Sequence, residues 1–421
     1  MREKAWMITS KERTMKSILI VISTLNTGGA QRAVSNIVCN MSEDIDIDIL
    51  LNDSDDIKYP YRGNIIDLGM EPVADKTSLL YQLKAFFVRY KKLKELKKTG
   101  KYDACISFLD SANFVNVLTG NKYCKTIVSV RAHMTQMCLN SNKYKYIVAP
   151  LVKLLYNHAD KVVAVAKGTA YDLAVNYNIK SEKIVTIYNG YDVKSIQNKA
   201  NALEVAKDND NFVITTMGRL DEQKGQWHLI KAFYEFHKKY PNSKLILLGD
   251  GILRDDLVKM THSLGLAGEV EFAGFKENPF AVVAHSDLFV FPSLFEGFPN
   301  ALVEAMACQV PVIAADCESG VREILAPSTD FNNRLTEKSD SIIEYAPYGI
   351  IVPCGAGWDG DVAKMSDEIT LDTSEQALFD AMYAMYEDAE LRDKYSKASL
   401  DRALELSIKE VCKKWEGVVF L

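Results

Sequence analysis

The chain has 421 residues, of which 48% are hydrophobic and 25% are charged, and its formal net charge is -6. This length predicts two domains that can each bury a core, and the acidic balance argues against nucleic acid as a partner. Eight cysteines are scattered without a CxxC pair or a Cys/His cluster, which favours a reduced, cytoplasmic protein without a disulfide framework.

The first half of the chain shows short apolar runs separated by helical patterns. Residues 1–14 contain no apolar stretch long enough for a signal peptide, so we expect an extension there, with Met15 as a candidate start. No apolar run approaches the ~18 residues needed to span a bilayer. Strands are predicted at 17–23, 44–52, 103–110, 124–133, 161–166 and 183–192. Strands that alternate with helices indicate a parallel doubly wound sheet, and we expect this Rossmann-like domain to cover residues 15–200.

The same pattern restarts after a polar stretch at 195–210, which we interpret as a linker. Further strands are predicted at 212–220, 244–251, 269–274, 287–293, 310–316 and 348–353. We therefore expect a second Rossmann-like domain at 201–400, with polar loops at 326–347 and 354–372. Residues 401–421 end the chain with a helical pattern. Two similar α/β halves favour a ligand site in the cleft between them.

A glycine loop, "TGGAQR", follows the first predicted strand. Gly28 and Gly29 would let a ligand approach backbone amides at the start of a helix, where an anion is favoured. The dinucleotide fingerprint GxGxxG is absent, which disfavours a nicotinamide cofactor. A tight turn from strand to helix explains the two glycines equally well.

Two cations lie in the segment "GRLDEQKG" (218–225), after the first strand of the second half. Arg219 offers a planar fork and Lys224 a point charge, a combination that suits a diphosphate at the carboxyl edge of the sheet. The alternative is an ordinary solvated loop.

Two carboxylates, Glu296 and Glu304, flank a turn and the start of a helix in "FEGFPNALVEAMA" (295–307). Pro299 and Asn300 suit the cap or the first turn of that helix. Free backbone amides at 299–302 would then point at an anion. The two acids would contact different parts of one elongated ligand. The alternative is a well-capped surface helix.

Seven segments resemble, in order, those of family 4 glycosyltransferases, which retain the anomeric configuration. The run from Glu296 to Glu304 resembles the E-x7-E motif of this family. The other six segments are "GGAQR" (28–32), "GRLDEQKG" (218–225), "LLGDG" (247–251), "AGFKENP" (273–279), "SDLFVFPS" (286–293) and "DCESGVREIL" (316–325). The resemblance covers residues 16–417. It implies the two-domain GT-B fold, with a nucleotide-diphosphate sugar held mainly by the second domain and the final helix, 401–421, packed on the first.

The resemblance also implies roles for single residues. Arg219 and Lys224 would clamp the diphosphate, Glu304 would bind the ribose hydroxyls, and Glu296 would bind hydroxyls of the transferred sugar. Further donor contacts are expected at Gly28, Gly29, Asp250, Gly251, Phe275, Lys276, Gly297, Phe298, Pro299, Asn300 and Ala301.

His133 occupies the place where this family often has a histidine facing the donor sugar. It would bind the sugar or take part in proton movement, although a lone histidine is more often structural. Arg131 is the alternative in the same loop, and Asp110 and Asn113 are weaker candidates on the acceptor side.

No metal is expected to be required. The stretches "DSDD" (53–56) and "DGD" (359–361) resemble the DxD motif of metal-dependent glycosyltransferases only superficially. Arg219, Lys224 and the helix that starts at Pro299 would stabilise the leaving diphosphate instead.

A basic amphipathic helix is predicted at 79–98. Its apolar positions are Leu79, Leu83, Phe86, Tyr90 and Leu93, and nine Lys or Arg residues stand between 76 and 101 against one acid, Glu95. Such a helix can lie on an anionic membrane surface, which would place the protein on the inner face of the cell membrane. An ordinary helix with a solvated basic face is the alternative.

The resemblance implies a retaining glycosyltransferase of polysaccharide or glycoconjugate biosynthesis. The donor would be a UDP-sugar, with GDP second, and the acceptor a hydroxyl of a glycan or lipid-linked glycan. Two alternatives stay open: an enzyme of the same fold with a soluble sugar-phosphate acceptor, and a non-catalytic glycan-binding subunit. The sequence specifies neither the sugar, the linkage nor the oligomeric state.

Overall fold

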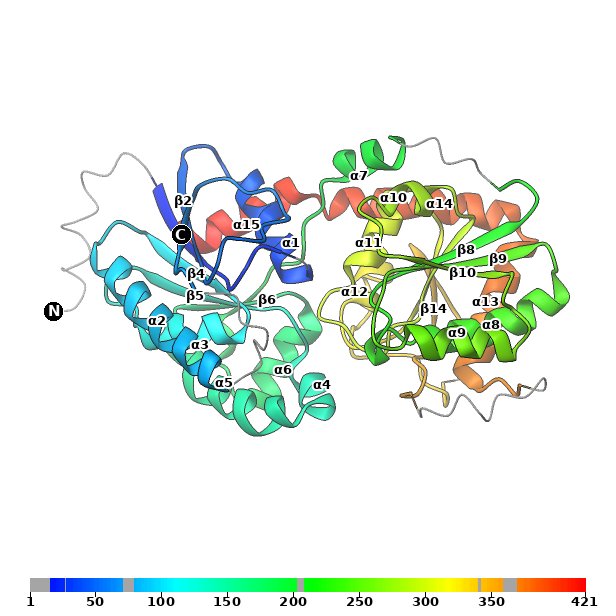
Figure 1. Ribbon diagram of the computed structural model, residues 1–421, viewed down its shortest axis with the longest axis horizontal. Coiled ribbons are helices and arrows are strands. Elements are labelled where there is room, and N and C mark those ends of the chain that lie inside the picture. The colour runs from blue at the N-terminus through cyan, green and yellow to red at the C-terminus, as the bar shows by residue number, and fades with distance from the viewer. Residues whose placement is uncertain (1–15, 27, 71–78, 203–207, 340–341, 359–368) are drawn as a thin grey trace. The chain divides into compact units, whose positions relative to one another are not determined.

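The computed structural model describes residues 16–26, 28–70, 79–202, 208–339, 342–358 and 369–421 (Figure 1). The expected extension at 1–14, the candidate start at Met15 and the segment 359–361 lie outside these residues. The chain forms two compact units. Unit 1 runs to Val165 and includes Thr169–Gly190 and Ile408–Leu421, and unit 2 comprises Ala166–Gly168 and Tyr191–Ser407.

Unit 1 is built on a seven-stranded sheet with the order β3-β2-β1-β4-β5-β6-β7, in which all the neighbouring strands pair in parallel. The strands are β1 (Lys16–Val21), β2 (Ile45–Leu51), β3 (Asn64–Asp67), β4 (Ala104–Phe108), β5 (Lys125–Val130), β6 (Lys161–Ala164) and β7 (Ile184–Thr186). The helices are α1 (Gly29–Asn40), α2 (Leu79–Lys98), α3 (Asp110–Leu118), α4 (Met134–Asn140), the π-helix η2 (Tyr144–Val148), α5 (Ala149–Leu155), η3 (Tyr156–His158), α6 (Lys167–Tyr177), which begins in unit 2, η4 (Ser181–Lys183) and α15 (Ile408–Phe420). The central strands are buried, as expected where helices cover both faces of a parallel sheet.

Unit 2 repeats this architecture with the strand order β10-β9-β8-β11-β12-β14-β13. The strands are β8 (Phe212–Met217), β9 (Ser243–Leu248), β10 (Val270–Gly274), β11 (Leu288–Phe291), β12 (Val312–Ala315), β13 (Glu344–Ala346) and β14 (Gly349–Val352). The helices are α7 (Val193–Ala200), η5 (Glu222–Lys224), α8 (Gln226–Lys239), α9 (Arg254–Ser263), α10 (Phe280–Ala284), α11 (Asn300–Ala307), α12 (Val321–Leu325), α13 (Thr373–Glu387) and α14 (Ala389–Glu405). The edge strand β13 pairs antiparallel with β14. The predicted fold class, two doubly wound α/β domains, is confirmed.

The boundary between the units differs from the expected one. It lies at Gly190–Tyr191 rather than at 200–201, because the stretch expected to open a linker forms the helix α7. This helix buries Val193, Ile196 and Ala200 and packs on α10 and α11 of unit 2. At the other end, α14 continues past residue 400, and the chain re-enters unit 1 at Ile408.

Helix α15 belongs to the core of unit 1. It packs against α1, and its Trp415 is fully buried among the strands, with its ring 5.7 Å from the ring of Phe108. Cys412 lies in the same core, where burial raises the pKa of its thiol to about 12.

Helix α2 does not expose all of the cations that were counted on its predicted basic face, because Arg89 and Lys97 are buried. The ammonium of Lys97 donates to the carbonyls of Asn116 and Gly120 at 2.9 and 2.8 Å, which closes the carboxyl end of α3. The guanidinium of Arg89 donates to the side chains of Asn52, Ser23 and Ser111, and burial lowers its pKa to about 10. Within the described residues, no helix is both long and apolar enough to cross a bilayer.

Candidate functional site in unit 2

The loops that follow β8 and β9 lie back to back at the carboxyl edge of the unit 2 sheet. Leu220 donates its backbone N–H to the carbonyl of Asp250 at 3.0 Å. Gly249 has φ of +133°, and a Cβ there would lie 1.9 Å from the carbonyl oxygen of Gly218. A side chain at this glycine would therefore push apart the two loops that carry Arg219 and Asp250.

Lys224 and Glu296 form the central ion pair of this edge. Lys224 ends the short helix η5 after β8, whereas Glu296 follows β11, the strand next to β8 in the sheet. Their Nζ and Oε1 atoms are 2.5 Å apart, and the two side chains are only 17% and 9% exposed. The Lys224 ammonium also lies 5.7 Å from the centre of the Phe291 ring. The sheet thus brings together a cation and an acid that are 72 positions apart.

Backbone pairing fixes Glu296 in place. Its N–H donates to the carbonyl of Glu318 at 2.5 Å, and the N–H of Ser319 donates to the carbonyl of Glu296 at 2.8 Å. The hydroxyl of Ser319 donates to the carbonyl of Gly297 at 2.9 Å. Gln223 adds a third anchor, since its side-chain amide donates to the carbonyl of Phe295 at 2.8 Å. These contacts fix the backbone that carries Glu296, next to the loop of Lys224.

Helix α11 begins directly after this loop, with Pro299 in the N-cap position. Asn300 does not act as the cap: its side-chain oxygen accepts a hydrogen bond from the hydroxyl of Tyr191 at 2.7 Å. The backbone amides of the first helical turn, at Asn300 and Ala301, lack intrahelical acceptors by the geometry of a helix start. Glu304 lies in the second turn of α11 and is buried, as are Phe298 and Pro299, while Gly297 is half-buried.

The other residues predicted in unit 2 lie on exposed loops. The Arg219 side chain is 72% exposed, and its guanidinium lies 3.1 Å from Asp221 and 3.4 Å from Gln223. Asp250 and Gly251 are exposed after β9, and Phe275 and Lys276 are exposed after β10. The loops are joined, because the N–H of Gly249 donates to the carbonyl of Gly274 at 2.9 Å. The predicted residues of unit 2 thus share one edge of the sheet, although Arg219 turns toward its own loop.

Three predicted residues belong to unit 1, also at the carboxyl ends of its strands. Gly28, with φ of +133°, precedes α1, and Gly29 is the first residue of that helix. His133 is buried at the N-cap of α4, where its Nδ1 lies 3.4 Å from the backbone N of Gln136 and 3.5 Å from the Asp172 carboxylate. Nδ1 cannot at the same time accept a hydrogen bond from the N–H of Gln136 and donate one to the carboxylate of Asp172. Because the N–H of Gln136 has hydrogen-bond geometry toward Nδ1, we assign the cap contact, in which Nδ1 accepts.

The alternatives named in unit 1 are also tied into the protein. Arg131 donates to the side chain of Asn189. Asp110 starts α3 and accepts hydrogen bonds from the hydroxyls of Tyr156 and Tyr144 at 3.0 and 3.1 Å. Burial raises the pKa of Asp110, against the opposite effect of those two hydroxyls. Asn113 is fully buried and donates to the carbonyl of Ser129 at 2.9 Å, which makes it a structural residue.

Sequence reasoning missed the residues that position this site: Gln223, Glu318, Ser319 and Tyr191. Glu318 and Ser319 lie in the segment "DCESGVREIL" (316–325), which the sequence analysis named only for its resemblance to the family. Gln223 lies inside the Lys224 loop, but nothing in its chemistry distinguishes it there. Their positions depend on pairing between loops, which leaves no local pattern in a chain.

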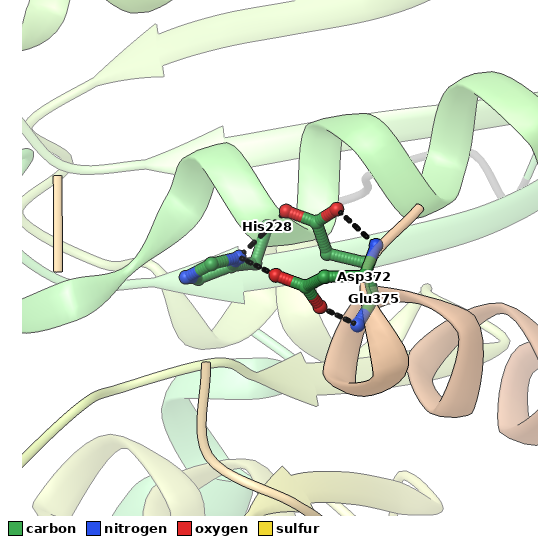
Figure 2. A group of neighbouring side chains, drawn as sticks. All are labelled: His228, Asp372 and Glu375. Atoms are coloured by element: carbon green, nitrogen blue, oxygen red, sulfur yellow. Dashed lines mark hydrogen bonds and ion pairs between the residues drawn. The ribbon is translucent and has the colours of Figure 1, made fainter. Parts of the chain in front are cut away.

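A histidine and two acids gather elsewhere in unit 2, and their geometry is that of a helix cap (Figure 2). His228 comes from α8, and Asp372 and Glu375 form a capping box at the start of α13. Both ring nitrogens of His228 face oxygen acceptors, Nδ1 toward Glu375 at 2.8 Å and Nε2 toward the Ala356 carbonyl at 2.7 Å. Lys231 adds a cation 2.9 Å from the same Glu375 oxygen. A metal needs a free nitrogen lone pair and unneutralised carboxylates, so this group fits a cation poorly.

We expect Glu375→Ala to lower the free energy of unfolding by about 3–5 kcal/mol, because it leaves Lys231 and His228 without their buried carboxylate. Glu387→Ala is the matched control at the other end of α13, where an exposed carboxylate accepts from Tyr240. That change should cost at most about 1 kcal/mol. Chemical denaturation measures both values. A wild type that gains stability on adding Zn²⁺, while Glu375→Ala does not, would instead indicate a metal site.

Comparison with known protein families finds similar sequences for both halves of the chain. The model "Glycosyltransferase Family 4" matches residues 27–195, and "Glycosyl transferases group 1" matches residues 198–346. An uncharacterized glycosyltransferase of Methanocaldococcus jannaschii is 33% identical over 357 residues, which cover 82% of this chain and 85% of that protein. The N-acetylgalactosamine-N,N'-diacetylbacillosaminyl-diphospho-undecaprenol 4-alpha-N-acetylgalactosaminyltransferase of Campylobacter jejuni is 31% identical over 313 residues, covering 74% and 83%.

Solved structures share the fold at low sequence identity. Anabaena Alr3699/HepE in complex with UDP aligns with a TM-score of 0.68 and 19% identity over 96% of this chain and 99% of that one. Sucrose-phosphate synthase from Thermosynechococcus elongatus aligns with a TM-score of 0.70 and 15% identity over 96% and 98%. Since two family models and a relative this similar span most of its length, the chain belongs to the group 1 and family 4 glycosyltransferases, with the GT-B fold.

Proposed function

We propose that this protein transfers a sugar, with retention of configuration, from a UDP-sugar to a hydroxyl of a lipid-linked glycan in surface polysaccharide biosynthesis. The observation that carries the proposal is the buried Lys224–Glu296 pair beside the start of α11, at the carboxyl edge of unit 2. The relatives support the choice of substrates. The Campylobacter jejuni relative is named for a diphospho-undecaprenol acceptor, and Anabaena Alr3699/HepE has been solved with UDP and with UDP-glucose.

In this proposal the unit 2 residues hold the donor and stabilise its leaving group. Lys224, with Arg219 from the same loop, neutralises the departing diphosphate, and the amides of Asn300 and Ala301 bind its distal phosphate. Glu304 binds the ribose, and Glu296 binds hydroxyls of the sugar. The exposed Asp250, Gly251, Phe275 and Lys276 line the nucleotide side.

In unit 1 we assign the acceptor side and further contacts to the donor. Gly28 and Gly29 present backbone amides to the diphosphate, and His133 contacts the sugar from the N-cap of α4, in the loop after β5. We assign no enzymic nucleophile. A same-face displacement, in which the leaving phosphate assists deprotonation of the acceptor hydroxyl, fits a site of cations and helix amides. No metal is assigned a role, and the enzyme works at the inner face of the cell membrane.

The test is transfer with defined substrates. The protein is incubated with UDP- and GDP-linked hexoses and N-acetylhexosamines, each with an undecaprenyl-diphosphate-linked glycan or with soluble sugar phosphates. The proposal expects transfer from a UDP-sugar to the lipid-linked glycan, with the anomeric configuration retained by NMR. An inverted product, or transfer to a sugar phosphate alone, would overturn it. Donor binding without any turnover would favour a non-catalytic subunit.

A further inference from the structure

An apolar face points to solvent along the continuous helical segment formed by η2 and α5. The buried side of this segment, Val148, Ala149, Val152 and Leu155, packs into the unit 1 core. Its exposed positions follow the same helical spacing and are Lys145, Tyr146, Ile147, Pro150, Lys153 and Leu154. Tyr146, Ile147 and Leu154 are 66%, 55% and 64% exposed. A surface helix normally turns a polar side outward, so a segment that is apolar on both sides indicates a second apolar contact.

Neighbouring helices extend this face. Helix α4 adjoins η2 and exposes Leu139. Helix α2 is tied to the same region, because Lys143 donates to the side chain of Gln82 at 3.2 Å. Figure 1 shows α2, α4 and α5 on the side of the unit 1 sheet opposite α1 and α15. The exposed apolar residues of these helices, which we call the η2–α5 surface, are Leu83, Phe87, Leu139, Tyr146, Ile147 and Leu154.

The chain segment that forms α4, η2 and α5 carries charged side chains of one sign. Residues 111–159 contain no Asp and no Glu, although the whole chain has a net charge of -6. The same stretch contains six cations: Lys122, Lys125, Arg131, Lys143, Lys145 and Lys153. Lys145 and Lys153 stand on the exposed side of the helical segment itself, beside Tyr146 and Leu154. The apolar residues are therefore bordered by positive charge that no neighbouring acid in the sequence neutralises.

We propose that the η2–α5 surface docks on an anionic phospholipid bilayer, with its apolar side chains among the acyl chains and its lysines at the headgroups. Tyrosine, leucine and isoleucine with bordering lysines match the chemistry of the membrane interface. A second copy of the chain fits less well, because a two-fold contact would place lysines against lysines. This surface, rather than α2 alone, provides the membrane contact. The proposal rests on the proposed function in one respect only, that a lipid-linked acceptor lies in the same membrane.

The same helical segment connects this surface with the carboxyl edge of the unit 1 sheet. Tyr144 of η2 is half-buried, and its hydroxyl donates at 3.1 Å to Asp110, the first residue of α3, which follows β4. Less than one turn of helix thus separates the exposed Tyr146 and Ile147 from Tyr144, whose hydroxyl contacts the proposed acceptor side. The glycan of a lipid-linked acceptor could therefore reach unit 1 while its lipid chain stays in the nearby bilayer.

Vesicle flotation tests this proposal without donor or acceptor, so a failure of the proposed transfer does not affect its reading. The probes are phosphatidylcholine vesicles with and without phosphatidylglycerol. Wild type is expected to float with the anionic vesicles. Ile147→Ser with Leu154→Ser should weaken that binding at least about tenfold, and Lys145→Gln with Lys153→Gln should remove the preference for anionic lipid. Leu404→Ser and Lys394→Gln, exposed positions of α14 in unit 2, are the matched controls and should bind like wild type.

Because all the changed side chains are exposed, the variants should keep the melting temperature of wild type, which is measured alongside. Equal flotation of wild type and Ile147→Ser/Leu154→Ser would overturn the proposal. A wild type that ignores both vesicles but is dimeric by sedimentation, and becomes monomeric on these substitutions, would overturn it in favour of a self-association surface. If only the variant Lys84→Gln/Lys91→Gln loses binding, the proposal is overturned and the membrane contact lies on α2.

Discussion

Lys224→Ala is expected to reduce kcat/KM for sugar transfer by about 10²–10³-fold, the cost of removing one preorganised group that stabilises transition-state charge. In the proposed transfer the leaving diphosphate gains negative charge as the bond to the sugar breaks, and the ion pair with Glu296 holds Lys224 in place at this edge. Its ammonium is fixed 2.5 Å from Glu296 and is mostly buried, so it needs little rearrangement. Arg219 is 72% exposed, and we expect Arg219→Ala to cost less.

The same substitution should also destabilise the protein, by about 3 kcal/mol, because it leaves the buried Glu296 carboxylate without its partner. A double variant separates the two effects. Lys224→Met with Glu296→Gln replaces the ion pair by neutral groups of similar size, so stability should partly return while transfer stays low. Lys239→Ala, an exposed lysine at the end of α8, is the control and should change neither quantity. Full transfer by a stable double variant would show that the pair serves folding alone.

Much of the fold could be predicted because buried parallel strands read as apolar runs. The run at 17–23 became β1 (Lys16–Val21), and 310–316 contained β12 (Val312–Ala315). The strands that were missed, β3 and β13, are short edge strands of four and three residues, which carry too little apolar sequence to stand out. Helix α7 was interpreted as a linker since only Val193, Ile196 and Ala200 mark its buried side.

In the candidate site, too, the local features could be predicted and the contacts between distant segments could not. The sequence predicted that Lys224 and Glu296 each follow a strand, because the local order of strand, loop and helix can be predicted from a single sequence. Their pairing was not predictable, since it requires β8 and β11 to be neighbours in the sheet. The burial of Lys97 shows the same limit in α2. A count of charges treats every lysine as solvated, whereas this one closes the end of α3 through Asn116 and Gly120.

For Glu296 we expect graded losses: Glu296→Gln should reduce kcat by about tenfold and Glu296→Ala by about a hundredfold. A residue that binds sugar hydroxyls can be replaced in part by an amide, which still accepts a hydrogen bond. A residue that attacks the sugar cannot, so a nucleophile would make Gln and Ala equally inactive. Equal and nearly complete losses would therefore contradict the assignment and would indicate a covalent intermediate.

Binding of UDP alone provides the second measurement, because UDP lacks the sugar that Glu296 is assigned to hold. In Glu296→Gln the Lys224 ammonium loses its carboxylate at 2.5 Å and becomes fully available to the diphosphate. Calorimetry should thus find UDP bound as tightly as by wild type or more tightly, while the gain in affinity on adding the sugar disappears. Glu304→Gln is the matched comparison, a buried acid of the same motif assigned to the ribose, and it should weaken UDP itself. Weaker binding of UDP by Glu296→Gln would show that this acid supports the diphosphate site rather than the sugar.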